Sequence, residues 1–162
     1  MPDKKPKSTH TIGLNRIKMI SFRVSEIPIV PQELKSSNLV YTQSYHFELI
    51  ETNTDKIICF YWCQYRYKDE KYDIIAMEGK IAVSFSIIEL EKITPLDDKT
   101  KKRFLPADLE ETLLGLTVST ARGSFHTSSS GYNISRFPIP LVNPRDIIEE
   151  AKKENLKGQE AG

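Results

Sequence analysis

The first half of the chain alternates between apolar and polar residues with a period of two, the pattern of β-strands that bury one face. The strongest such segment is KIICFYWCQYRY at 56–67, and short polar turns at 51–55 and 68–71 separate it from similar segments on either side. Residues 25–38 contain two prolines and are expected to form a loop or crossover. The sequence therefore predicts four strands, at 12–24, 39–51, 56–67 and 72–88, the last three joined as an antiparallel meander.

Two details of the outer strands can be predicted as well. In the first strand, Ile12, Leu14, Ile20 and Phe22 fall on one even register, interrupted by charged residues, and are expected to share a face. In the fourth strand, Gly79 is a candidate for a β-bulge, because glycine within a strand often marks one.

Helical spacing replaces the alternation after residue 95. Pro106 is expected to open a helix whose apolar residues recur every three or four positions, and Gly123 is expected to end it. A Ser- and Gly-rich loop is predicted at 124–135, followed by an extended segment at 137–142 that contains two prolines.

A second helix is predicted near the end of the sequence. Asn143 is a suitable N-cap and Pro144 suits the first helical position, and the helix is expected to run to about Lys153 with Ile147 and Ile148 facing inward. Four antiparallel strands followed by two helices predict the α+β class.

Length and charge narrow the class of protein. The 162 residues suit one domain, which we expect at 12–153, with flexible segments at 1–11 and 154–162. The formal net charge of +1 argues against a dedicated duplex-DNA binder, which needs a strong basic excess. No apolar run is long enough for a membrane span, and no apolar segment follows the basic N-terminus as a signal peptide requires. The expected location is therefore the cytoplasm.

The residues that usually carry chemistry show no catalytic or metal-binding spacing. Cys59 and Cys63 would share a strand face roughly 13 Å apart, too far to bridge, and are expected to be buried thiols. His10, His46 and His126 fall in different elements, and there is no GxSxG, GxGxxG or Walker motif. We expect neither an enzyme nor a metal or other cofactor.

Aromatic residues are concentrated in the middle of the chain. Of the 15 Phe, Trp and Tyr residues, nine lie between Tyr41 and Tyr72. In the strand at 56–67, Tyr61 and Tyr65 point to one face and Phe60 and Trp62 to the other, so both faces carry large rings.

This distribution allows three interpretations. The rings belong to the core with a few exposed, or they line an oligomer interface or an apolar groove for other chains, or they form a platform for single-stranded nucleic acid. The third needs basic residues between the rings, and in this segment only Arg66 and Lys68 provide them.

The order of elements and four short segments resemble the SecB family of bacterial export chaperones, and more closely the SecB-like relatives. The segments are NRIKMISFR at 15–23, EGKIAVSFSI at 78–87, STARG at 119–123 and PIPLVNPRDII at 138–148. The Arg-Gly pair followed about 15 residues later by PLVNP is the most specific part. The resemblance covers roughly residues 12–153.

The resemblance implies a four-stranded antiparallel sheet with two main helices packed on one side, assembled as a homotetramer that is a dimer of dimers. It implies an ATP-independent holdase without cofactor, whose partners are unfolded polypeptides, either preproteins for export or an antitoxin of a toxin–antitoxin system. Carried onto this chain, the client groove would be formed by Val40, Tyr41, Tyr45, Tyr61, Trp62, Tyr65, Ile139, Leu141, Pro144, Ile147 and Ile148.

One feature of the family is not matched. SecB proper is acidic and docks the translocase motor SecA through acidic residues on its sheet, a further partner that the resemblance implies. Here the corresponding positions are Met19, Arg23 and Ile75. These residues speak against SecA docking in the usual way, whereas chaperoning an antitoxin needs no acidic face.

Overall fold

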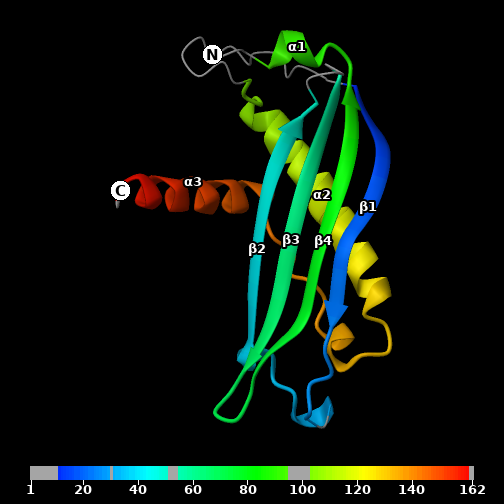
Figure 1. Ribbon diagram of the computed structural model, residues 1–162, viewed down its shortest axis with the longest axis vertical. Coiled ribbons are helices and arrows are strands. Elements are labelled where there is room, and N and C mark those ends of the chain that lie inside the picture. The colour runs from blue at the N-terminus through cyan, green and yellow to red at the C-terminus, as the bar shows by residue number, and fades with distance from the viewer. Residues whose placement is uncertain (1–10, 30, 51–54, 95–102, 161–162) are drawn as a thin grey trace, which may run out of the picture.

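A long antiparallel sheet forms the framework of the computed structural model, which describes residues 11–29, 31–50, 55–94 and 103–160 (Figure 1). The strand order is β1-β4-β3-β2, so β1 and β2 form the two edges. The strands are β1 (Ile12–Val24), β2 (Leu39–Leu49), β3 (Lys56–Lys68) and β4 (Asp73–Ile87). All four predicted strands and the meander are confirmed. The expected segment at 1–11 and the turn at 51–55 lie almost entirely outside the described residues.

The sheet has one covered face and one open face. Along β3, and along β4 from Met77 onward, the odd-numbered residues are buried and the even-numbered ones are partly buried or exposed, as period-two alternation predicts. The long helix α2 crosses the covered face, which we call the inner face, and leaves the outer face toward the viewer in Figure 1. Tyr61 and Tyr65 are on the inner face and Phe60 and Trp62 on the outer face, as the sequence predicted.

Strand β1 departs from the predicted register. It pairs with β4 through two irregularities, between Leu14 and Arg16 and between Met19 and Ser21. Each irregularity adds one residue to β1 and so reverses which residues face inward. Met19 therefore takes an inner-face position opposite Ile81, and Ile20 does not join the even-numbered residues Ile12, Leu14 and Phe22 on the inner face. A single even register along β1 was therefore wrong, because bulges depend on the partner strand and not on the local pattern.

Helix α2 is longer than predicted. The elements after the sheet are α1 (Leu90–Ile93), α2 (Ala107–Ser128) and α3 (Pro144–Glu160), with 3-10 turns at Pro31–Glu33, Ser36–Asn38 and Asn133–Arg136. Gly123 does not end α2, so the first part of the predicted loop at 124–135 is helical. The added turn places Phe125, which is fully buried, against Phe22 with 5.7 Å between ring centroids.

Gly79 explains how this turn reaches the sheet. A Cβ atom at Gly79 would lie 2.6 Å from Cε1 of Phe125, so the missing side chain makes room for the ring. Gly79 pairs regularly with Phe22 and Cys63, and the irregularity between β3 and β4 lies at Tyr65/Arg66 instead. The prediction of a bulge at Gly79 was wrong, and close packing is its role.

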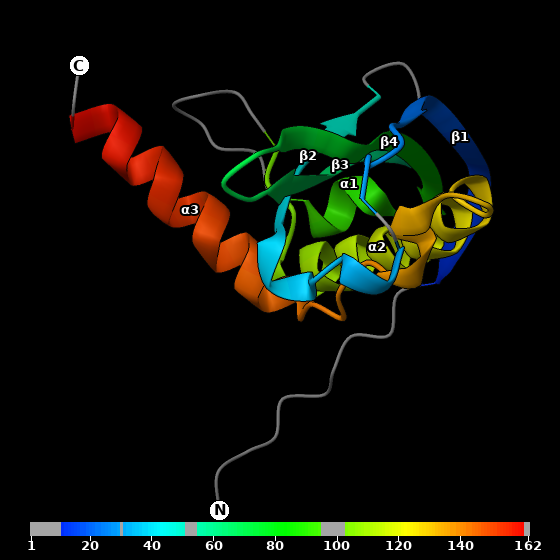
Figure 2. The same cartoon turned by 90° about the horizontal axis from the view of Figure 1, so that it is seen from below.

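Helix α3 leaves the body of the protein beside β2 and extends outward from that edge (Figure 2). Ile147 and Ile148 in its first turns are buried, as predicted, but the helix continues to Glu160, beyond the expected end near Lys153. Of the two main helices, α2 therefore covers the sheet, whereas the buried residues Ile147 and Ile148 of α3 lie near its beginning. None of the helices described is long and apolar enough to cross a membrane.

Candidate functional site

Three aromatic side chains line the inner face of the edge strand β2. We call Tyr41, Tyr45 and Phe47 the β2 aromatic row. All three are half-buried, because they lie at the margin of the area that α2 covers. The rings of Tyr45 and Phe47 meet edge to face at 5.7 Å between centroids, and Tyr41 lies 5.1 Å from the ring of Tyr65. The row therefore presents apolar ring surface that is held in place and remains partly open.

Hydroxyl groups fix one end of this row. The Oη atoms of Tyr41 and Tyr61 are 2.6 Å apart, and the Tyr61 hydroxyl also lies 2.7 Å from Oε1 of Gln43, to which it can donate. Burial, with the neighbouring Cys63, raises the pKa of Tyr41, and burial raises that of Tyr61. Both phenols are therefore neutral at physiological pH, and their hydrogen bonds stabilise the rings.

The extended segment at 137–142 is fastened to the same face. Tyr65 donates from its hydroxyl to the carbonyl of Pro138 at 2.8 Å, and Nε of Arg122 donates to the carbonyl of Ile139 at 3.0 Å. Ile139 is buried, whereas the side chain of Leu141 is 85% exposed, the largest fraction among the exposed large hydrophobic residues. An anchored backbone therefore presents an unusually exposed leucine.

Charged groups connect β2 with both long helices. The Tyr45 hydroxyl donates to Oε1 of Glu110 on α2 at 2.9 Å, and burial together with this bond raises the pKa of Tyr45. On α3, Lys152 lies 4.0 Å from Glu110, and Arg145 pairs with Glu111 at 3.1 Å. The middle of the aromatic row is thus tied through Tyr45 to the start of α2, and through Glu110 to α3.

The structure divides the predicted groove residues among several environments. Tyr41 and Tyr45 are half-buried on the inner face, and Pro144 is half-buried at the start of α3. Leu141 is exposed. Buried in the core are Tyr61, Tyr65, Ile139, Ile147 and Ile148. Val40 and Trp62 lie on the outer face, because each pairs with an outward-pointing residue of the neighbouring strand, Val40 with Arg66 and Trp62 with Lys80. One continuous groove in this protomer cannot include both Val40 and Tyr41.

Several residues of this region were not predicted. Phe47 shares the parity of Tyr41 and Tyr45, so the alternation of β2 was a sufficient signal for it. Gln43, Glu110 and Arg122 hold the tyrosines and the extended segment, and their roles depend on contacts between distant parts of the chain. No local pattern identifies such contacts.

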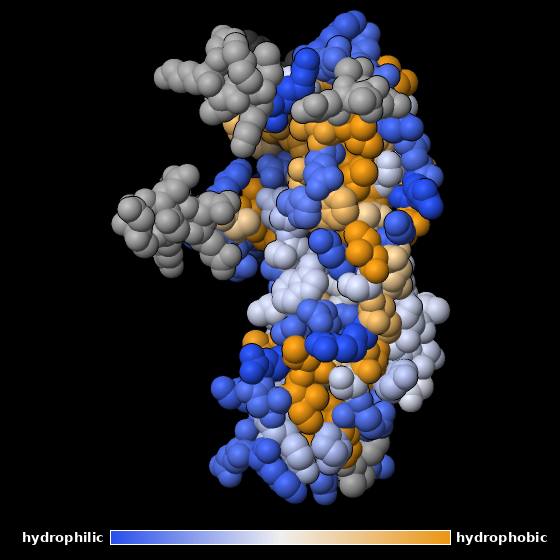
Figure 3. Space-filling view, in the orientation of Figure 1, coloured by the Kyte–Doolittle hydropathy of each residue, from blue (hydrophilic) through white to orange (hydrophobic). Residues whose placement is uncertain are grey.

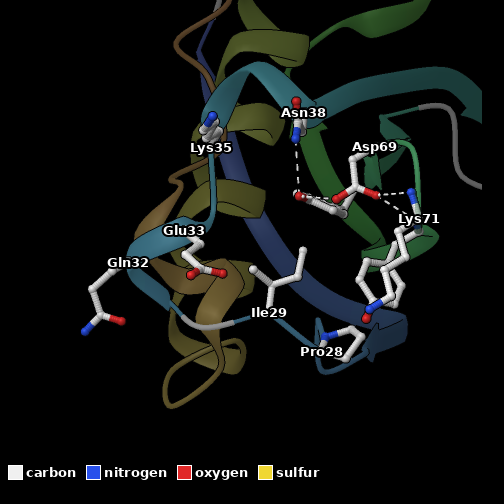
Figure 4. Close-up of a pocket in the computed structure, with 10 residues that line it drawn as sticks. Pro28, Ile29, Gln32, Glu33, Lys35, Asn38, Asp69 and Lys71 are labelled. Carbon is white, nitrogen blue, oxygen red and sulfur yellow. Dashed lines mark hydrogen bonds between the residues drawn. The ribbon is translucent and has the colours of Figure 1, made fainter.

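A separate open cavity of about 750 Å³ lies at the end of the sheet where β2 begins, between the β1–β2 crossover and the β3–β4 turn (Figure 4). None of the predicted groove residues lines it. Asp69 accepts hydrogen bonds there from the Tyr67 hydroxyl at 2.7 Å and from the backbone N–H groups of Lys71 and Tyr72. Its carboxylate therefore stabilises the turn, and both of its oxygens already accept hydrogen bonds from the protein.

The cysteines are placed as predicted. Cys59 and Cys63 are free thiols with no exposed surface, and burial raises the pKa of each to about 12. Such thiols are protonated and unreactive at neutral pH. Across the described residues, no group of three or more His, Cys, Asp or Glu side chains is positioned to hold a metal ion.

The α+β architecture, with four antiparallel strands and helices packed on one face, is the SecB-like fold that the sequence resemblance predicted. A SecB-like chaperone from Mycobacterium tuberculosis, solved in complex with a ChAD peptide from an antitoxin, matches this chain with a TM-score of 0.52 and 12% sequence identity. The match covers 81% of this chain and 90% of that one. A protein of unknown function from Streptococcus agalactiae matches with a TM-score of 0.45 and 7% identity, over 83% of this chain and 99% of that chain. The sequence matches no family model and no curated protein.

Proposed function

We propose that the protein is an ATP-independent holdase chaperone that binds unfolded polypeptides along the β2 aromatic row. The observation that carries the proposal is that a chain with a SecB-like fold has partly open Tyr41 and Tyr45 rings and an exposed Leu141, whose segment is fastened through Tyr65, the ring neighbour of Tyr41. Unfolded chains expose apolar side chains that a folded protein would bury, and ring surface of this kind can cover them.

The chemistry of the row suits weak and sequence-tolerant binding. Burial of apolar surface contributes about 25 cal/mol per Å² without directional demands, so diverse segments can bind. Aromatic rings add contact area at low conformational entropy cost, because each has two side-chain torsions. A chaperone that must also release its clients without ATP needs such contacts in place of one strong site.

The client class is a further part of the proposal. The chaperone with the similar fold was solved with an antitoxin peptide, which supports an antitoxin segment as one client, and a secretory preprotein is the other. This chain has Met19, Arg23 and Ile75 at the positions where the family carries acidic residues that dock SecA. The substitution of these acidic residues favours a client route that does not involve SecA. A cytoplasmic location suits both clients.

Suppression of aggregation tests the proposed function. A chemically unfolded model protein is diluted into buffer with increasing amounts of the full chain, without ATP, and light scattering is followed. We expect scattering to fall as the chain approaches equimolar amounts and to be unchanged by added ATP. Undiminished scattering at a large excess of the chain would contradict the holdase function.

We also propose that the protein is a homo-oligomer, a dimer or, as the family resemblance implies, a tetramer. Within the part of the chain that the structure describes, the edge strands β1 and β2 each pair on one side only. On β1 the inner-face residues Leu14, Ile17 and Met19 are exposed by 52%, 46% and 36%. A second protomer that covers them would bury apolar surface that is unusual on a monomer. Multi-angle light scattering at micromolar concentration is expected to give two or four times the 18.6 kDa chain mass, and a single-chain mass would disprove this.

A further inference from the structure

The outer face of the sheet has a strong excess of positive charge. Strand pairing places seven cationic and three acidic side chains on this face, a formal excess of four, although the whole chain carries only +1. The cations are Arg16, Lys18, Arg23, Lys56, Arg66, Lys68 and Lys80, and the carboxylates are Glu48, Asp73 and Glu78. The charge of the molecule is therefore distributed unevenly, with the basic part concentrated on one surface.

The carboxylates of this face are already paired. Glu78 pairs with Arg23 at 3.0 Å, Asp73 is held by Arg66, and Glu48 lies 3.4 Å from Nε2 of His46. None of the carboxylates in the described part of the chain pairs with Arg16, Lys18 or Lys80. These three positive charges, on the adjacent strands β1 and β4, are therefore available to an external anion.

Aromatic side chains lie beside these cations. Phe60 and Trp62 on β3 are partly buried, and Nζ of Lys80 lies 5.4 Å from the centroid of the Phe60 ring. Lys18 and Phe60 pair with the same residue of β4, Ala82, from its two sides. Figure 3, which views this face, shows patches of hydrophobic residues in the upper and the lower part of the sheet, with hydrophilic residues between and beside them. The surface therefore combines apolar contact area with unpaired positive charge.

We propose that the outer face is a docking surface for an acidic polypeptide segment of a partner protein, separate from the client-binding row on the inner face. Acidic side chains of the partner would pair with Arg16, Lys18 and Lys80, and its apolar residues would cover Phe60 and Trp62. Charge complementarity of this kind provides specificity and a fast association rate. A second copy of this chain does not fit, because two faces with the same excess charge repel each other.

The arrangement favours a polypeptide over single-stranded nucleic acid. A nucleic-acid platform needs open ring faces for bases to stack on. Here the His46 ring stacks on Phe60 at 4.6 Å with an angle of 8° between planes, and Lys80 lies over the same ring. Nε1 of Trp62 donates to Oε1 of Glu78, which places a carboxylate that repels phosphate at the indole edge. A segment with spaced carboxylates and apolar residues avoids both conflicts.

Binding can be read directly at this surface, because Trp62 is the only tryptophan of the chain. The probe is a synthetic peptide of alternating glutamate and leucine, with a peptide that carries lysine in place of glutamate as its counterpart. The glutamate peptide is expected to change Trp62 emission and to lose affinity as salt is added, because exposed charges are screened. The lysine peptide should leave the emission unchanged.

Charge-neutralising variants locate the contact. The triple variant Arg16→Gln/Lys18→Gln/Lys80→Gln is expected to bind the glutamate peptide about tenfold or more weakly than the parent, because three favourable charge pairs are lost. The matched control Lys35→Gln/Lys71→Gln/Lys92→Gln removes the same charge from exposed lysines elsewhere and should bind as the parent does. Suppression of client aggregation should be normal in both variants, so failure of this proposal is separate from failure of the holdase function.

Three results would overturn the proposal. Equal weakening in the two triple variants would show that only the net charge matters. No change in Trp62 emission at low salt would show that the surface does not take an acidic segment. Tighter and salt-sensitive binding of an oligothymidylate, or of phosphatidylserine vesicles, would assign the face to nucleic acid or to a membrane surface instead.

Discussion

Between pH 8 and about pH 11 the protein is expected to lose much of its free energy of unfolding. The reason is the burial of neutral, protonated groups in the core. Burial raises the pKa of the Cys59 and Cys63 thiols from 9.0 to about 12, and burial near Cys63 raises the pKa of Tyr65 from 10.0 to about 12. In the unfolded chain these groups ionise first, and ionisation therefore favours unfolding.

The direction of the pH effect follows from these shifts. Because each folded pKa lies above the unfolded value, the stabilisation is fully present below about pH 9 and is lost as the pH rises toward about 12. At pH 11 each cysteine accounts for a loss of roughly 2–3 kcal/mol, at about 1.4 kcal/mol per pKa unit. The two together approach the lower end of the ~5–15 kcal/mol stability of a typical domain.

Urea denaturation at pH 8, 9, 10 and 11, followed by circular dichroism under reducing conditions, measures this loss. The variant Cys59→Ala/Cys63→Ala should be less stable at pH 8 but should lose less between pH 8 and 11. Tyr132→Phe is a suitable control, because Tyr132 is exposed, and it should follow the parent curve. A free energy of unfolding that stays constant up to pH 11 would contradict the burial of these thiols.

The sheet was predictable from the sequence because its signal is local. Along β3 every second residue from Ile57 to Tyr67 is buried, so the alternation alone defines both the strand and its inner face. The same logic separates Val40 from Tyr41, since neighbouring residues of a strand point to opposite faces. Val40 and Trp62, which the expected groove includes beside the inner-face tyrosines, therefore lie on the other face of the sheet, as strand parity alone indicates.

The errors that could not have been avoided come from contacts between distant parts of the chain. Gly123 is a reasonable helix stop by its type, yet α2 continues because Phe125 packs into the space beside Gly79. The burial of Tyr61 likewise depends on where α2 crosses the sheet, and the exposure of Leu141 depends on how Tyr65 and Arg122 fasten its segment. Side-chain types indicate an aromatic surface here, but only the packing shows which rings are open.

Substitution of the accessible aromatic surface is expected to abolish client holding in combination and to weaken it only modestly one residue at a time. Tyr41→Ala, Tyr45→Ala and Leu141→Ser each remove apolar contact area, and each should weaken binding of an unfolded client by about 1 kcal/mol. The triple variant should lose about 3 kcal/mol, more than a hundredfold in affinity, if the contacts are independent. Fluorescence anisotropy with a labelled unfolded client measures the affinities, beside the aggregation assay.

Loss of stability is the competing explanation, since Tyr45 donates a hydrogen bond to Glu110 and the hydroxyl of Tyr41 is hydrogen-bonded to that of Tyr61. The variants therefore need melting curves and two controls. Tyr45→Phe keeps the ring and loses only the hydroxyl bond, so it should hold clients normally. Val118→Ala, at a buried position of α2 that is not a member of the aromatic row, lowers stability and should also hold clients while folded. Leu141→Ser is the most informative single change, because a side chain that is 85% exposed contributes little to folding but is fully available to a client. If folded Leu141→Ser and the folded triple variant both bind as tightly as the parent, the client does not bind along the β2 aromatic row.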